Sequence, residues 1–258
     1  MRIWDVHPGY LNRQSLLGEH RELHAVVTVI DADKTGYANH PETRRWRGYG
    51  WALRMRHALL AGEMALRGYT DRSPVISSSS AGKWPDVYID APARQFELLR
   101  GKYAGREAGR IPLPRTLHEL WSHHKYSVLA RNVHEYESIG REVSSQSVGF
   151  AELAGRLTEL LRGRPDEGGI RNAALHMWGY VSDSVVPERG RGRQTGDIGD
   201  IDDIADPGGI GDPGDIGDPS VAPLRSLLGE IAERVRASGE PYLLHSTALS
   251  ELAVWLED

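Results

Sequence analysis

The chain has 258 residues, of which 40% are hydrophobic and 26% charged, and its formal net charge is −5. These values are ordinary for a soluble globular protein with one large domain or two smaller ones. There is no cysteine, which excludes disulfides, thiolate metal sites and cysteine nucleophiles. No apolar run is long enough to span a membrane and residues 1–10 lack the core of a signal peptide, so we expect a cytoplasmic protein.

The negative charge is concentrated in one stretch. Residues 183–222 carry nine Asp and one Glu against three Arg, which leaves the rest of the chain at a net +2. Residues 1–75 are at +3 and contain five histidines. This mild positive charge permits binding to a nucleic acid but does not by itself argue for it.

The first long element that we expect is a helix over Leu11–Ile30. Leu16 and Leu23 lie on a stripe of apolar residues at helical spacing, which predicts a buried face. Another face carries small residues and one carboxylate, that of Glu22. With Arg21 beside it as a phosphate donor, this carboxylate would lie in a shallow trough open to a substrate. The alternative is an ordinary solvated glutamate.

Residues 31–49 predict a polar connection that ends in an arginine-rich segment. Its arginines interleave with aromatic residues: Arg44, Arg45, Trp46, Arg47 and Tyr49. This mixture is suited to phosphate contacts and base stacking. A solvated turn with one aromatic side chain tucked inside fits the pattern equally well.

The remaining periodic segments predict an all-α fold. A second helix is expected over Gly50–Gly68, followed by a linker rich in serine and proline over residues 76–92. Helical periodicity returns at Ala93. The later helices are predicted over Pro114–Arg131, Val133–Val143, Val148–Leu161, Arg171–Val185, Val221–Ala237 and Pro241–Glu257. We therefore expect a small N-terminal helical module and a larger C-terminal helical bundle.

One segment of the bundle has a different composition. Residues 187–222 contain repeats of Gly, Asp and Pro with isolated Ile. Such a segment cannot bury enough apolar surface to offset the entropy of ordering it, so we expect a disordered acidic loop.

The start of the chain resembles the pyrimidine dimer DNA glycosylases of the endonuclease V type. The resemblance rests on the opening Met1-Arg2-Ile3 and on the run Glu19-His20-Arg21-Glu22 in the first helix. It implies that Glu22 is the catalytic glutamate and that the α-amine of Met1, 21 positions earlier, is the other catalytic group. Arg2 is too bulky for the usual removal of Met1, so this register should hold.

The resemblance also indicates the nucleic-acid-binding residues. Gln14 matches a family residue near DNA, whereas Ser15 departs from the family's histidine. Arg67-Gly68-Tyr69 ends the second helix in a way similar to the family, and the resemblance fades after about Val75, so residues 1–75 form the expected glycosylase-like module. The predicted contacts to nucleic acid are Arg2, Gln14, Arg21, Arg44, Arg45 and Arg47.

The implied reaction is DNA repair by base excision and cleavage at the abasic site. An α-amine titrates at about 7.7–8.0, against about 10.4 for lysine, so part of it is neutral at pH 7. The amine can attack the sugar and form a Schiff base, while a carboxylate stabilises the cationic sugar and moves protons. This chemistry implies no cofactor.

The expected partner is damaged double-stranded DNA, from which a base is flipped, with RNA as the alternative. We expect no membrane and no obligate protein partner. The alternative function is a non-catalytic nucleic-acid-binding protein on the same scaffold.

Two runs in the C-terminal half, His123–Ser127 and Asn172–Tyr180, resemble the YbgA-type bacterial domain of unknown function. The resemblance covers roughly Phe96–Val186 and Leu224–Glu257, so residues 93–258 are expected to form this domain. Its occurrence beside a thiouracil-desulfurising domain suggests nucleic-acid substrates.

Four histidines of this half raise the question of a metal site: His118, His123, His124 and His176. Adjacent histidines on one helix point about 100° apart, and the residue four positions after His118 is Ser122, which is not a usual ligand. We therefore expect no metal site, and we expect His176 and Trp178 to lie in the core.

Overall fold

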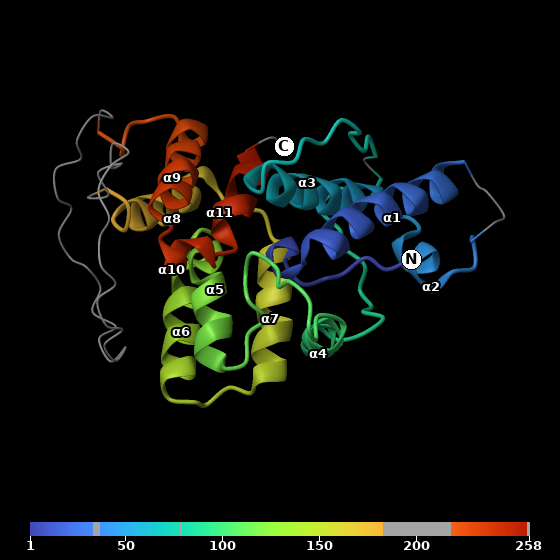
Figure 1. Ribbon diagram of the computed structural model, residues 1–258, viewed down its shortest axis with the longest axis horizontal. Helices are drawn as coiled ribbons and strands as arrows, with labels where there is room; N and C mark the ends of the chain where they lie inside the picture. The colour runs from blue at the N-terminus through green and yellow to red at the C-terminus, as the bar shows by residue number, and fades with distance from the viewer. Residues whose placement is uncertain (33–36, 78, 183–217, 257–258) are drawn as a thin grey trace.

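The chain folds into a helical protein, seen here in a computed structural model that describes residues 1–32, 37–77, 79–182 and 218–256 (Figure 1). The α-helices are α1 (Arg13–Asp31), α2 (Pro41–Trp46), α3 (Gly50–Leu66), α4 (Pro92–Lys102), α5 (Leu117–Leu129), α6 (Val133–Ser144), α7 (Phe150–Arg162), α8 (Glu167–Trp178), α9 (Leu224–Ser238), α10 (Pro241–Leu244) and α11 (Ala248–Glu251), and η1 (Pro8–Tyr10) and η2 (Leu252–Leu256) are 3-10 helices. The described ranges contain no β-strand, which confirms the predicted all-α class. None of their helices is both long and apolar enough to cross a membrane.

Side-chain caps start several helices at the positions where the sequence supplies Asn or Thr. At the start of α1, the side chain of Asn12 accepts a hydrogen bond of 2.9 Å from the amide of Ser15. At the start of α5, Thr116 and Glu119 form a reciprocal capping box. These caps fix where the helices begin, and α1 starts two residues later than expected because its cap is Asn12.

In two segments the structure forms different elements from those that the sequence predicts. Residues 31–49, expected as a polar connection, contain α2, whose first turn begins at Pro41, a position that tolerates proline because its amide needs no partner. The single helix expected over Pro241–Glu257 is instead divided into α10, α11 and η2. It breaks because Thr247 donates to the carbonyl of His123 from both its amide (2.8 Å) and its hydroxyl (3.0 Å), which turns the chain onto α5.

The acidic loop predicted over residues 187–222 lies outside the described residues, except for 218–222. There the amide of Val221 donates to the carbonyl of Asp218 in a turn (3.1 Å). The helix expected over Arg171–Val185 begins earlier, at Glu167, and ends at Trp178.

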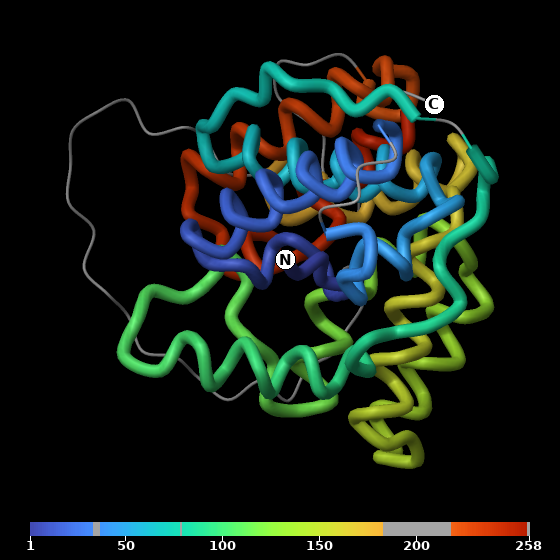
Figure 2. Tube along the Cα trace, turned by 90° about the vertical axis from the view of Figure 1, so that its right-hand side faces the viewer, coloured from blue at the N-terminus to red at the C-terminus, as the bar shows by residue number. Residues whose placement is uncertain are grey.

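Helix α3 lies at the centre of the packing. Leu53 and Leu60 belong to a hydrophobic cluster that includes the N-terminal segment, α1 and residues of α4 to α7. Met55 and Leu59 belong to a second cluster with residues of α5 and of α8 to α11. Figures 1 and 2 show α1 running beside α3. The first hydrophobic cluster thus contains residues from both sides of the linker expected at residues 76–92. The division of the chain into an N-terminal module and a C-terminal bundle stays a prediction.

A buried ion-pair network holds α3 against the C-terminal helices. The carboxylate of Glu63, which is fully buried, contacts the guanidinium groups of Arg67 and Arg110 at 2.7 Å each. It also accepts a hydrogen bond of 2.7 Å from the hydroxyl of Ser250 on α11. Burial opposes ionisation, but the two arginines outweigh it and lower the pKa of Glu63 to about 2. Glu63 therefore stays ionised at neutral pH.

A glycine on α3 tests this packing. Replacing glycine by alanine inside a helix usually stabilises it by about 1 kcal/mol. At Gly62, however, a Cβ would lie 2.7 Å from the carbonyl oxygen of Ser250 and 3.0 Å from a methyl of Val254. We expect Gly62→Ala to lower the free energy of unfolding by about 1–3 kcal/mol, as overpacking does, in urea denaturation followed by circular dichroism.

The matched control is Gly155→Ala on α7, where an added Cβ would meet nothing within 4 Å. This control should raise the free energy of unfolding by about 0.5–1 kcal/mol. Equal stabilisation by both substitutions would contradict the close approach of α3 to α11.

Candidate active site

The first residues of the chain are held by side-chain acceptors from three different helices. Ile3, Trp4 and Val6 are buried, so their amides need partners inside the protein. Four successive backbone amides donate hydrogen bonds to side-chain oxygens. The pairs, with the amide first, are Arg2–Glu22 (2.5 Å), Ile3–Glu42 (3.1 Å), Trp4–Glu19 (3.2 Å) and Asp5–Gln95 (2.8 Å). This arrangement fixes the position of the N-terminal segment against α1, α2 and α4.

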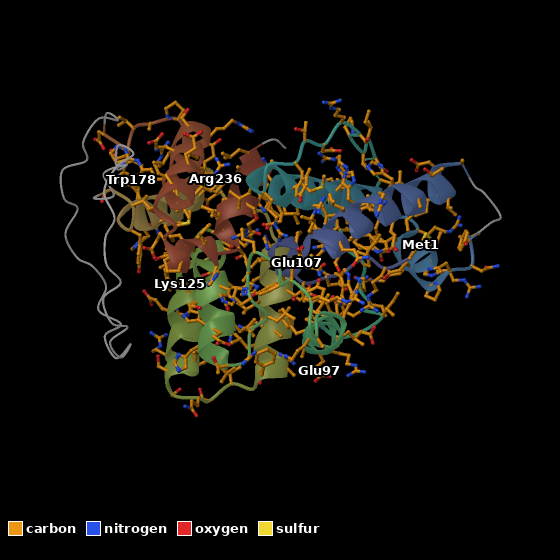
Figure 3. The ribbon with its side chains drawn as sticks, in the orientation of Figure 1. Met1, Glu97, Glu107, Lys125, Trp178 and Arg236 are labelled. Atoms are coloured by element: carbon orange, nitrogen blue, oxygen red, sulfur yellow. The ribbon has the colours of Figure 1, made fainter. Side chains whose placement is uncertain are left out.

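The carboxylate of Glu22 lies beside the start of the chain. Its Oε2 accepts the hydrogen bond from the amide of Arg2, one peptide unit from the α-amine of Met1. Met1 and Glu22 are both half-buried, and the side chain of Met1 packs against the first hydrophobic cluster. Figure 3 shows Met1 at the end of the molecule that α1 and α2 form. The structure thus brings together the two residues predicted as a catalytic pair.

Glu19, one turn before Glu22 on α1, has a structural partner. Its carboxylate is buried and makes a two-pronged ion pair with the guanidinium of Arg56 on α3, at 2.7 and 3.0 Å. Arg56 also donates to the carbonyl of Val6 (3.0 Å). The carboxylates of Glu19 and Glu22 therefore differ, because Glu19 is enclosed by protein whereas Glu22 remains partly open to solvent.

Two of the predicted nucleic-acid-binding residues lie together on the surface. Gln14 and Arg21, both exposed on α1, line a depression of about 440 Å³. Arg13 from the same helix and Arg106 from the segment after α4 line it as well. Three arginines in one hollow are suited to binding phosphate.

A comparison with protein families finds a match in the first part of the chain. Residues 1–77 match the model of the pyrimidine dimer DNA glycosylase family. This part of the chain contains α1 to α3. No curated protein and no solved structure matches the chain. The relationship of residues 93–258 to the YbgA-type domain stays a prediction.

Two other arginines predicted to contact nucleic acid, Arg2 and Arg45, pair with carboxylates of the protein itself. The guanidinium of Arg2 pairs with the carboxylate of Asp90 at 2.6 Å and lies 4.4 Å from the centre of the Trp4 ring. Arg45, whose side chain is only 5% exposed, pairs with the carboxylate of Asp5 and donates to a backbone carbonyl at 2.7 Å. Both side chains thus tie the N-terminal segment to its neighbours.

The remaining residues of the arginine-rich segment divide between surface and core. Arg44 is exposed and donates to the side chain of Asn39 (2.9 Å), and Arg47 is exposed as well. Trp46 is 1% exposed, and its indole donates to the carboxylate of Glu42 (3.1 Å). Its ring is therefore not available for stacking on a base, and the interpretation with one aromatic side chain tucked inside describes Trp46 correctly.

The histidines of the C-terminal half differ in burial, since His123 and His124 are buried whereas His176 is exposed. The hydroxyl of Tyr10 lies 3.1 Å from Nδ1 of His123 and 3.4 Å from Nδ1 of His124, and all three side chains are buried. Trp178 is buried as expected, but His176, expected in the core, is exposed because it lies on the outer face of α8.

Sequence reasoning missed a different group of histidines. His20 and His24 on α1, His57 on α3 and Asp71 in the segment after α3 converge, with one ligand atom from each within 4.8 Å of the others. Burial is the main cause that lowers the pKa of His57 to about 4. The signal in the sequence was the spacing of His20 and His24, four residues apart on a predicted helix, since this spacing places both rings on one face.

The placement of Arg44 and Arg45 on one short helix provides a matched test. Arg45→Met removes a buried partner of Asp5, and the loss of one member of a buried ion pair typically costs about 3–5 kcal/mol. We expect the free energy of unfolding to fall by about 3 kcal/mol, at the lower end of this range, because Arg162 still pairs with Asp5 at 2.9 Å. Arg44→Met, at the surface, should change it by less than about 0.5 kcal/mol. Urea denaturation of both variants measures the difference, and equal stabilities would show that the Arg45 ion pair has no structural role.

Proposed function

We propose that this protein is a DNA repair enzyme that excises a damaged pyrimidine and cleaves the strand at the resulting abasic site. The family match of residues 1–77 supports this assignment. The observation that carries it is the hydrogen bond from the amide of Arg2 to Glu22. This bond keeps a partly open carboxylate next to the residue whose α-amine is the proposed nucleophile.

The two groups divide the reaction between them. The neutral α-amine of Met1 attacks C1′ of the damaged nucleotide, the glycosidic bond breaks, and the base leaves. The departing base takes a proton from the attacking amine, the sugar ring opens with O4′ taking a proton from solvent, and the new bond between nitrogen and C1′ becomes the double bond of a Schiff base. The carboxylate of Glu22 first stabilises the positive charge on the sugar. It then accepts a proton from C2′, so that the bond between C3′ and the phosphate oxygen breaks by β-elimination.

The depression beside α1 supplies the DNA contacts in this proposal. Arg21 and Gln14 bind the phosphate backbone, together with Arg13 and Arg106. Flipping a damaged nucleotide out of the duplex costs a few kcal/mol. The contacts to the DNA phosphates hold the duplex in place during this flipping.

Borohydride trapping tests the chemistry directly. The protein, produced with Met1 as its first residue, should form a covalent adduct with an abasic duplex or a dimer-bearing duplex when borohydride is present, because borohydride reduces the Schiff base. A variant extended by Gly-Ser at the N-terminus should lose the adduct, since the amine moves away from Glu22. Glu22→Gln should lose strand cleavage.

Glu97→Gln on α4 is the control for these variants, because Glu97 is an exposed carboxylate that pairs with Arg94 on the same helix. It should react as the unchanged protein does. Binding to both duplexes without adduct or cleavage would contradict the enzymatic proposal and favour the non-catalytic nucleic-acid-binding protein.

Salt dependence tests the DNA contacts separately. For a duplex, the slope of log K against log salt falls by about 0.9 for each phosphate contact removed. We expect Arg21→Gln to weaken binding to the duplex at low salt and to reduce the magnitude of this slope by about one. Arg94→Gln, on the exposed surface of α4, should leave both unchanged in the same fluorescence titration. An unchanged slope for Arg21→Gln would remove Arg21 from the interface.

A further inference from the structure

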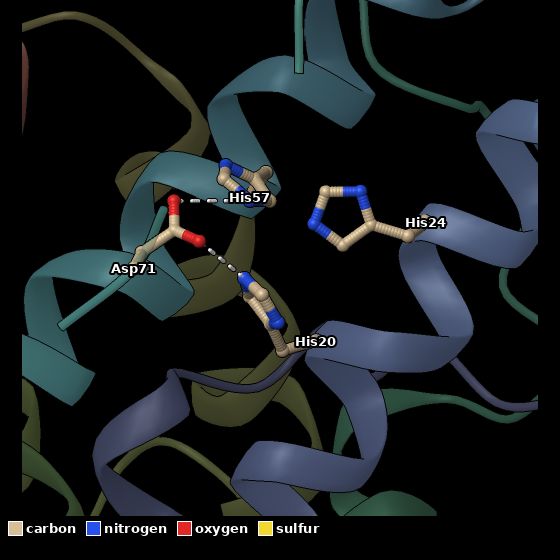
Figure 4. Close-up of side chains that lie close together, drawn as sticks. All are labelled: His20, His24, His57 and Asp71. Atoms are coloured by element: carbon tan, nitrogen blue, oxygen red, sulfur yellow. Dashed lines mark hydrogen bonds and ion pairs between the residues drawn. The ribbon is translucent and has the colours of Figure 1, made fainter. Parts of the chain in front are cut away.

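Three histidines and one aspartate converge at the junction of α1, α3 and the segment that follows α3. Figure 4 shows the rings of His20 and His24, one turn apart on α1, facing His57 of α3 and the carboxylate of Asp71. The ring centroids of the three histidines are 4.8 to 4.9 Å apart. The fold therefore brings together donors from three separate parts of the chain.

Two of these imidazoles have a buried nitrogen without a hydrogen-bond partner. Nε2 of His24 and Nε2 of His57 are both shielded from solvent, and neither has a hydrogen-bond partner among the described residues. Leaving a buried polar atom unpaired costs about 1–3 kcal/mol, so two such atoms in one cluster call for an explanation. A cation between the rings would satisfy both.

Asp71 supplies the negative charge of the cluster. Its two carboxylate oxygens approach two different rings, with Oδ1 at 3.2 Å from Nε2 of His20 and Oδ2 at 3.5 Å from Nε2 of His57. The second distance is too long for a good hydrogen bond. A carboxylate placed between imidazoles in this way can serve either as a fourth ligand or as the partner that orients them.

The donor set selects the type of metal. Three imidazole nitrogens and one carboxylate oxygen are ligands typical of Zn²⁺ and similar divalent transition metals, whereas Ca²⁺ and Mg²⁺ require mostly oxygen ligands. Tetrahedral ligands at zinc distances are about 3.3 Å from one another. The ligand atoms here lie within 4.8 Å of one another, so side-chain movements of about 1 Å close the site.

We propose that His20, His24, His57 and Asp71 form a structural binding site for a divalent transition metal of the zinc type. Four protein ligands leave no open position for substrate, which is the arrangement of a structural zinc site. The ion would join α1 to α3 and to the segment around Asp71. The site is separate from the proposed reaction, because Glu22 lies between His20 and His24 in sequence and so points to another face of α1.

Zinc titration of the full chain tests this proposal. The protein, produced without a histidine tag and stripped of metal by a chelator, is titrated with Zn²⁺ against a competing chromophoric chelator. We expect one tight equivalent per chain and a rise in the thermal unfolding midpoint when Zn²⁺ is bound. Removal of a residue that only supports a metal ligand typically weakens metal binding 10- to 100-fold. His24 and His57 are proposed as ligands themselves, so we expect His24→Gln and His57→Gln to weaken Zn²⁺ binding by more than about 100-fold.

His118→Gln is the matched control, because His118 is an exposed histidine far from the cluster in sequence, on α5. It should bind Zn²⁺ as the unchanged protein does. Co²⁺ provides a second measurement, since a tetrahedral site gives a strong visible absorption that both cluster variants should lose. If His57→Gln fails to fold, the less buried His24→Gln carries the test.

The absence of a tight equivalent in the unchanged protein would overturn the proposal. Equal zinc affinity and equal thermal stabilisation in His24→Gln, His57→Gln and His118→Gln would also overturn it, because the metal would then be bound elsewhere. Neither result depends on glycosylase activity, so the metal site and the proposed function can fail independently.

Discussion

The architecture of the candidate site depends on carboxylates that hold the main chain of the first residues. In an extended chain, successive amides point to opposite sides. Accordingly, the amides of Arg2 and Trp4 reach α1, whereas the amide of Ile3 between them reaches α2. Glu22 and Glu19 are three residues apart on α1, so they present two acceptors on neighbouring turns. The segment runs antiparallel to the helix, and this direction brings Glu22 to the first residues.

Two buried carboxylates of the helical core form ion pairs with arginines from other parts of the chain. Glu19 meets Arg56 of α3, and Glu63 meets Arg110 from the segment before α5. A buried ion left alone would cost several kcal/mol, so each pair requires both of its elements to be in place. Because α3 contributes to both pairs, it links the N-terminal segment and α1 on one side to the C-terminal helices on the other.

The candidate site was predictable to the extent that its evidence is local. The run that ends in Glu22 lies on one helix, and its distance from Met1 is a count along the chain. The part played by Arg45 was not predictable in this way, because its partner Asp5 is 40 residues away. An arginine beside a tryptophan has the same local pattern whether it faces DNA or a buried aspartate. Only the packing of α2 against the N-terminal segment separates the two.

The sequence alone determined that the protein is helical and where most helices lie, because periodicity, caps and prolines act within a few residues. It also determined the acidic stretch and the similarity of the first residues to a DNA glycosylase. The tertiary structure decided that Trp46 is core, that Pro241–Glu257 is broken at Thr247, and that His20 and His24 meet His57 and Asp71. These outcomes are contacts between residues far apart in the chain, and such contacts form only when helices pack against one another.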